Sequence, residues 1–143
     1  MHRAIGAALL FPVTLSCAAA EHPVLMRGAL LKGEVFADPR AETLEETSDT
    51  GTVGARDLVV HESEDGCLQT GVYETGRNRY QVDEPYEHDE FMYFLEGGVT
   101  LSSKDGTMIE AAAGDGVLVP KGWTGLWDSA GYRKIYVIYD CPD

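Results

Sequence analysis

From Asp57 onward, short apolar runs alternate with Gly, Asp and Pro about every ten residues. Runs of this length between turn residues predict β-strands, and eight of them favour a sandwich or a small closed barrel. No long stretch has the 3.6-residue period of an amphipathic helix. The pattern therefore predicts an all-β fold with strands near residues 58–61, 68–74, 78–82, 90–95, 99–102, 108–111, 116–119 and 134–139.

Turn residues separate these runs. Asp105-Gly106 predicts a hairpin, because a type I′ turn requires positive φ at both central residues. Gly97-Gly98 and the Pro120-Lys121-Gly122 segment predict turns between other apolar runs. Residues 37–53 are polar and acidic with little to bury, so we expect a loop or a short exposed helix there.

The first twenty residues predict a secretory signal peptide. A basic start at Arg3 precedes an uncharged run from Ala4 to Ala20 that ends in small residues. The run is shorter than the roughly 20 apolar residues that cross a bilayer, so we expect no transmembrane helix in the mature chain. The predicted location is secreted or periplasmic, with lipid attachment at Cys17 as an alternative.

The predicted organisation is a signal peptide (1–20), an N-terminal segment with an acidic loop (21–56) and one β-barrel domain (57–143). The chain carries 24 acidic and 11 basic residues, for a net charge of −13. This charge excludes nucleic acid as a partner, because neutralising phosphates requires clustered Lys and Arg. In the predicted mature chain, Cys67 and Cys141 form one disulfide or remain two buried thiols; the sequence leaves both open.

Two spaced motifs resemble those of the cupin superfamily. Glu90 and Gly97 keep the spacing that ends the first cupin motif, and Gly114, Pro120 and Gly122 keep that of the second. Across residues 71–139 the sequence is most similar to the subgroup of ureidoglycine aminohydrolase and ethanolamine-utilisation type cupins. This resemblance implies a single-domain cupin fold, a small jelly-roll β-barrel, and a homodimer.

The resemblance also implies a metal site holding Mn, Fe or Zn, but most ligand positions differ. Two His, a Glu and a later His bind the metal in ordinary cupins; here Glu84, Tyr86 and Gly125 stand at the three His positions. Glu84 matches the Glu of the ureidoglycine aminohydrolase pattern, whose other ligand positions differ. We therefore expect no cofactor, and any metal would lie at His88 and Glu90.

The same region supplies candidate catalytic residues: Glu84, Tyr86 and Glu90. Two carboxylates sharing a pocket cannot both ionise cheaply, so one would have a raised pKa and could transfer protons. A solvated loop explains Glu84 equally well. If Glu90 faces the barrel lumen, the period of two places His88 on the same side, as a general base or ligand; the alternative is an exposed histidine.

The candidate ligand-binding residues are His88, Tyr93, Trp123 and Trp127. The two indoles could cover the pocket mouth and stack on a flat ligand, although ordinary barrel packing explains them as well. The basic residues near these strands, Arg77, Arg79, Arg133 and Lys134, are expected to be solvated at the surface.

Three function classes remain open. The first, which we expect, is a secreted cupin that binds a small organic ligand and has lost its metal-binding histidines. The second is a hydrolase or lyase-like enzyme related to ureidoglycine aminohydrolase, acting on a small nitrogenous or carboxylate metabolite. The third is a structural dimer. The acidic charge makes strongly anionic ligands unfavourable unless one of the nearby arginines faces inward.

Overall fold

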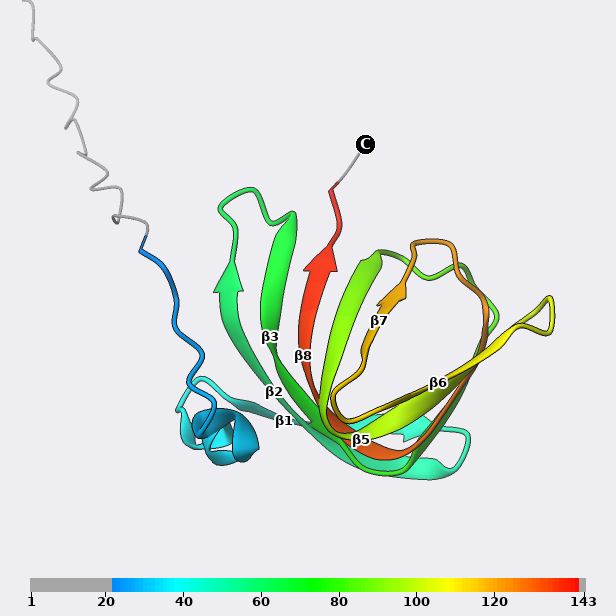
Figure 1. Cartoon of the computed structure of the whole chain (residues 1–143), viewed down its shortest axis with the longest axis horizontal. Coiled ribbons are helices and arrows are strands. Elements are labelled where there is room, and N and C mark those ends of the chain that lie inside the picture. The colour runs from blue at the N-terminus through cyan, green and yellow to red at the C-terminus, as the bar shows by residue number, and fades with distance from the viewer. Residues whose placement is uncertain (1–21, 142–143) are drawn as a thin grey trace, which may run out of the picture.

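The computed structural model describes residues 22–141, which form an antiparallel β-barrel preceded by two short helical turns (Figure 1). The predictions for residues 1–20, including Cys17, lie outside this range. Within it, no helix has the length and apolar character needed to span a membrane. The elements are η1 (Leu30–Lys32), η2 (Glu34–Ala37), β1 (Glu42–Ser48), β2 (Gly51–Glu62), β3 (Leu68–Thr75), β4 (Asn78–Val82), β5 (Asp89–Ser103), β6 (Met108–Ala112), β7 (Gly116–Val119) and β8 (Gly125–Tyr139).

All eight strands belong to one sheet, in the order β1-β2-β3-β8-β5-β6, with β4 also pairing β8 and β7 also pairing β5. The two longest strands, β5 and β8, pair with each other from end to end. Each changes its second partner along its length: β8 pairs β4 and then β3, and β5 pairs β7 and then β6. The sheet therefore curls round these two strands into a cup (Figure 1).

The bend in β5 lies at the glycine pair that the sequence suggested would separate two strands. Gly97 has a φ of +67°, and its backbone lies so close to Gly131 on β8 that a Cβ would collide with that carbonyl. The pairing of β5 with β8 shifts register on both sides of this point but continues. The predicted runs 90–95 and 99–102 are therefore one bent strand, because glycine permits the close approach as well as the turn.

The acidic segment differs from its prediction. Residues 37–53 were expected to be a loop or an exposed helix, but they contain β1 and the start of β2, which pair as a hairpin through Ser48 and Gly51. Alternate residues of β1 face the barrel, as the partial burial of Leu44 and Glu46 shows. Three glutamates in this strand obscure the alternation in the sequence. The start of the β-barrel domain, which the sequence placed at residue 57, consequently falls inside β2.

The barrel core is made by alternate residues of the central strands, which face the lumen. Its buried members are Met92, Phe94, Val99, Leu101, Ala111, Val117, Val119, Trp127 and Tyr132. Outside the barrel, η2 contacts β2, where the guanidinium of Arg56 lies 4.5 Å from the centre of the Phe36 ring.

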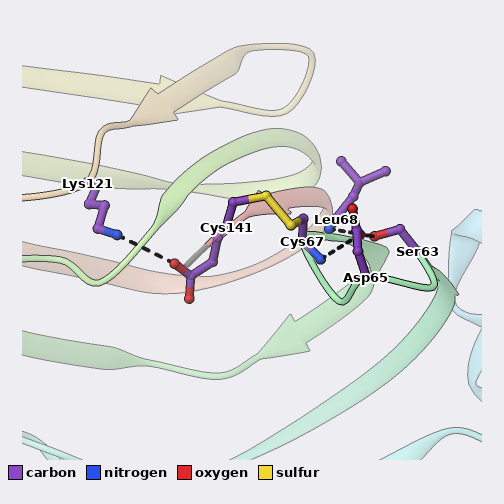
Figure 2. The surroundings of a disulfide bond; sticks show 7 residues. Ser63, Asp65, Cys67, Leu68, Lys121 and Cys141 are labelled. Atoms are coloured by element: carbon purple, nitrogen blue, oxygen red, sulfur yellow. Dashed lines mark hydrogen bonds and ion pairs between the residues drawn. A yellow bond between two sulfur atoms is a disulfide. The ribbon is translucent and has the colours of Figure 1, made fainter. Parts of the chain in front are cut away.

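Cys67 and Cys141 form a disulfide, which resolves the choice that the sequence left open (Figure 2). It joins the turn between β2 and β3 to the residues that follow β8. The turn itself is held by Asp65, whose carboxylate accepts hydrogen bonds from the Ser63 hydroxyl and the Cys67 amide. Next to the disulfide, the Asp140 amide donates a hydrogen bond to the Cys67 carbonyl over 2.9 Å.

Candidate functional site

A cavity of about 340 Å³ opens among the inward-facing side chains of the barrel. Its volume lies at the lower end of the range for small-molecule sites. The walls are mainly aromatic, with a few charged groups. The aromatic and charged lining residues are Glu46, Asp57, Tyr73, Tyr80, Tyr86, His88, Glu90, Trp127, Tyr132, Lys134 and Tyr136.

Strand register brings these residues together from distant parts of the chain. Tyr73 on β3 lies between Asp57 on β2 and Lys134 on β8, and all three face the cavity because directly opposed residues share a face. Two residues further along β8, Tyr136 lies opposite Met92 of β5. The site is thus built on the central strands of the sheet.

The central feature of the site is a buried ion pair. The Lys134 ammonium lies 2.5 Å from Glu90 Oε1, and the two side chains are only 8% and 4% exposed. The same ammonium is 5.4 to 5.5 Å from the ring centres of Tyr73, Trp127 and Tyr132, which is within cation–π distance. The ammonium is therefore held by one carboxylate and three aromatic rings.

Glu90 has further partners on its other oxygen. The Tyr86 hydroxyl donates a hydrogen bond to Oε2 over 2.6 Å, and His88 Nε2 lies 4.0 Å from the same atom. Burial alone would raise the pKa of Glu90, but the Lys134 ammonium and the Tyr86 hydrogen bond hold it below its ordinary value. Burial and the adjacent Glu90 carboxylate raise the pKa of the Tyr86 phenol. Glu90 is thus kept ionised and Tyr86 neutral.

Two more carboxylates face the cavity, each with a phenol partner. Tyr136 donates a hydrogen bond to Asp57 over 3.0 Å, and Tyr80 donates one to Glu46 over 2.8 Å. Burial raises the pKa of Asp57, and the Glu42 carboxylate adds to the effect. Gly71 gives the Tyr136 ring its space, because a Cβ there would lie 2.5 Å from the phenol oxygen.

Four of the residues predicted from the sequence line this cavity: Tyr86, His88, Glu90 and Trp127. The prediction that His88 shares the side of Glu90 agrees with their 4.0 Å separation. Trp127 is buried in the wall, and its indole N–H is closed off without a hydrogen-bond partner among the residues described. The cavity therefore meets the carbon atoms of this indole.

Glu84, Tyr93 and Trp123 do not line the cavity. Glu84 is exposed in the loop between β4 and β5. Tyr93 is 40% exposed and lies on the outer side of β5, since it alternates with the buried Met92 and Phe94. The placement of these two residues at the pocket was wrong, and for Tyr93 the period of two already contradicted it.

Trp123 packs next to the cavity without forming its wall. Its indole N–H donates a hydrogen bond to the Ser103 hydroxyl over 3.0 Å, and its ring meets the Tyr86 ring edge-on, with centres 6.5 Å apart. Trp123 thus follows the alternative of ordinary barrel packing rather than ligand stacking, and its ring packs against the Tyr86 ring.

The sequence interpretation missed Lys134, Asp57 and Glu46. Lys134 and Arg133 were expected to be solvated, but both are buried. The alternation of Lys134, Tyr136 and Ile138 in an apolar strand is a signal that Lys134 shares an inward face. Nothing local indicates that this face meets Glu90, because that depends on the pairing of β5 with β8.

The residues present do not fit the metal site of ordinary cupins. Of the expected ligands only Glu90 is kept, and the Lys134 ammonium already lies against it. No group of three His, Cys, Asp or Glu side chains within residues 22–141 is arranged to hold a metal ion. A cation placed beside Glu90 would also meet the positive charge of Lys134 at close range.

A bent antiparallel barrel with a site in its lumen is the architecture of a cupin. Residues 62–136, a little over half of the chain, match the EutQ-like cupin domain. The chain therefore belongs to the family of EutQ-like cupin domains, as its motif spacing predicted. No functionally curated protein matches it.

Solved structures show the same fold at low sequence identity. A DUF861-family protein of unknown function from Pseudomonas syringae pv. tomato is 23% identical over 68% of this chain, with a TM-score of 0.61. This chain spans 44% of that protein, which is less than half of its length. The cupin domain of Cnp3 from Schizosaccharomyces pombe is 12% identical over 71% of this chain and 88% of its own length, with a TM-score of 0.50.

The EutQ protein of Clostridium difficile is 25% identical over 62% of this chain and 68% of its own length, with a TM-score of 0.48. The finer resemblance to ureidoglycine aminohydrolases stays a prediction.

Proposed function

We propose that the barrel cavity binds a small organic ligand without the help of a metal ion. The observation that carries this proposal is the buried Lys134–Glu90 pair in the wall of an aromatic-lined cavity. The Lys134 ammonium lies against Glu90, the one ligand position of ordinary cupins that this chain keeps, and a cavity of about 340 Å³ lies next to it. Aromatic walls with a few fixed polar groups are typical of binding sites for small organic molecules.

Binding is favoured over the enzyme alternative by the electrostatics of Glu90 and Tyr86. A general acid or base works best when its pKa lies near the operating pH. The pKa of Glu90 is lowered and that of Tyr86 is raised, so both shifts lead away from neutrality. The hydrolase or lyase-like activity predicted as the alternative would need a ligand that raises the pKa of Glu90 or lowers the pKa of Tyr86 toward neutral pH.

We also propose that the protein acts outside the cytoplasm, as its N-terminal sequence predicts. The Cys67–Cys141 disulfide supports this, because such bonds persist mainly in oxidising compartments. Cell fractionation combined with the mass of the mature N-terminus tests it. Cleavage after Ala20 supports a signal peptide, whereas a lipid on Cys17 supports the alternative; an uncleaved cytoplasmic chain would contradict both.

The ligand proposal is tested with a small-molecule screen monitored by thermal shift, followed by a pair of variants on β4. Val82 lines the cavity, whereas its neighbour Gln81 is exposed. Val82→Trp should fill the cavity and weaken binding of any hit at least tenfold, and Gln81→Trp should bind it normally. The proposal fails if no compound binds, or if Val82→Trp folds and binds as tightly as the unaltered protein.

A further inference from the structure

Building on the ligand-binding function proposed above, we infer that the cavity selects a small organic cation, namely an amine that is protonated at neutral pH. The inference rests on the charges that line the cavity and on how each of them is compensated. Neutral molecules of the same size should bind more weakly, and carboxylates more weakly still.

The charges of the lining do not cancel. Lys134 and Glu90 neutralise each other at 2.5 Å. Asp57 and Glu46 remain, and neither forms an ion pair with any side chain of the described residues. Two carboxylates therefore face the cavity without a cation of their own.

The hydrogen bonds to these carboxylates leave their charge in place. Asp57 accepts one from Tyr136 and Glu46 one from Tyr80. A phenol is a neutral donor, so it satisfies a lone pair without cancelling the negative charge. The phenols also fix the orientation of both carboxylates, which reduces the ordering needed when a cationic ligand binds.

The two carboxylates make the potential negative in this part of the cavity, and the pKa values of the neighbouring phenols shift in the matching direction. Burial and then the Glu46 carboxylate raise the pKa values of Tyr73 and Tyr80. Burial and then Asp57 raise the pKa of Tyr136. Close to these carboxylates, the negative charge of a phenolate or of an anionic ligand is therefore disfavoured. The positive charge of a cationic ligand is favoured by the same electrostatic field.

The aromatic walls suit an ammonium group as well. The Lys134 ammonium already lies over three of the rings, so the cavity holds one such group in its own structure. Tyr80 and Tyr136, which donate hydrogen bonds to the uncompensated carboxylates, also line the cavity and add aromatic surface there. Carboxylates and aromatic rings together form the surroundings that an organic ammonium prefers.

Three probes of similar size separate charge from shape: 2-phenylethylamine, 2-phenylethanol and phenylacetate. Isothermal titration calorimetry at neutral pH should give at least tenfold tighter binding for the amine than for the alcohol, with phenylacetate weakest. Asp57→Asn and Glu46→Gln should each reduce amine affinity about tenfold and leave binding of the alcohol unchanged. Glu45→Gln, on the exposed side of β1, should change neither.

The outcomes distinguish this inference from the proposed function. Binding of the alcohol or phenylacetate as tight as that of the amine overturns the preference for cations and leaves ligand binding intact. An unchanged amine affinity in both folded carboxylate variants overturns the placement of the ammonium. Absence of binding by all three probes overturns the inference, and the screen with Val82→Trp then decides the proposed function separately.

Discussion

The burial of Lys134 makes its ammonium and the carboxylate of Glu90 depend on each other. Lys134→Met removes the cation and leaves a buried carboxylate whose remaining polar partners, among residues 22–141, are Tyr86 and His88. We expect a loss of about 3 to 5 kcal/mol in the free energy of unfolding, as is typical when one partner of a buried pair is deleted. Urea denaturation measures it.

The double variant Lys134→Met with Glu90→Gln should recover most of that loss, because no buried charge remains. As a control, Lys121→Met removes the exposed pair of Lys121 with Asp140 and should have no measurable effect. Equal stabilities of the single and double Lys134 variants would show that packing, rather than charge, accounts for the loss.

Acid should weaken the pair in a defined direction. Because the folded protein holds the pKa of Glu90 below its ordinary value of 4.5, its ionised form stabilises the fold above that pH, and the contribution is lost as the pH falls further. The thermal midpoint of the unaltered protein should therefore drop more steeply below about pH 4.5 than that of the double variant.

Asp57 acts in the opposite sense, since its raised pKa favours the protonated folded state and its ionisation costs stability as the pH rises above 3.8. Both proteins keep Asp57, but only the unaltered protein keeps the Lys134 ammonium, which lowers the pKa of Asp57, so the Asp57 contribution is larger in the double variant. Parallel pH profiles would contradict the assigned role of Glu90.

Among the strands, the contact between β3 and β8 depends on the absence of a side chain at Gly71. A Cβ at this position would collide with the backbone of Leu58 as well as with the Tyr136 phenol. Gly71→Ala should cost about 1 to 3 kcal/mol, the usual range for overpacking, and should separate Tyr136 from Asp57. Urea denaturation and the amine titration both report it.

The matched control is Gly54→Ala on β2, where a Cβ meets nothing within 4 Å. This variant should be as stable as the unaltered protein. If Gly71→Ala is equally neutral, the sheet must adjust there and the close approach of Tyr136 is not a constraint.

Strand prediction from the sequence succeeded where the apolar runs were short and bounded by turn residues. β4 and β7 begin and end as predicted, at Asn78–Val82 and Gly116–Val119. It failed for β1, whose glutamates hide its alternation, and for β5, where Gly97 marks a bend inside a strand rather than its end. In both cases a partner strand, absent from the local sequence, decides the conformation.

The same limit applies to the site. Tyr86, His88 and Glu90 lie within five residues of one another, so motif spacing was enough to group them. Lys134 is 44 residues from Glu90 in the sequence, and only the register of β5 with β8 brings them together. The preference for a solvated Lys134 was reasonable for an isolated lysine, and it fails because the lumen offers a carboxylate and three rings.

At the scale of the whole molecule, the outer face of the barrel exposes a set of neighbouring apolar side chains. Phe91 on β5 lies between Leu118 on β7 and Val137 on β8, and Phe91 and Leu118 are 45% and 62% exposed. The family resemblance implies a homodimer, and we propose that its two copies associate through this face. Sedimentation at micromolar concentration should show a dimer.

Phe91→Glu should convert that dimer to a monomer without unfolding it, because the residue faces away from the core. Met108→Glu alters an apolar side chain on β6 that is more exposed than Phe91, and it should leave the dimer intact. A monomer in the unaltered protein, or a dimer that survives Phe91→Glu, would contradict the proposed interface.

The disulfide also decides how the molecule would respond to tension. β8 carries Lys134 and Tyr136, and it could be peeled from β3 and β5 one hydrogen bond at a time, starting at Tyr139. Cys141 is fastened to Cys67, so tension applied beyond it passes directly into the turn between β2 and β3. In the oxidised protein, tension on the C-terminal end therefore acts on β2, β3 and β8 together. In the reduced protein it would act on β8 alone and separate this strand, which carries Lys134, from β3 and β5.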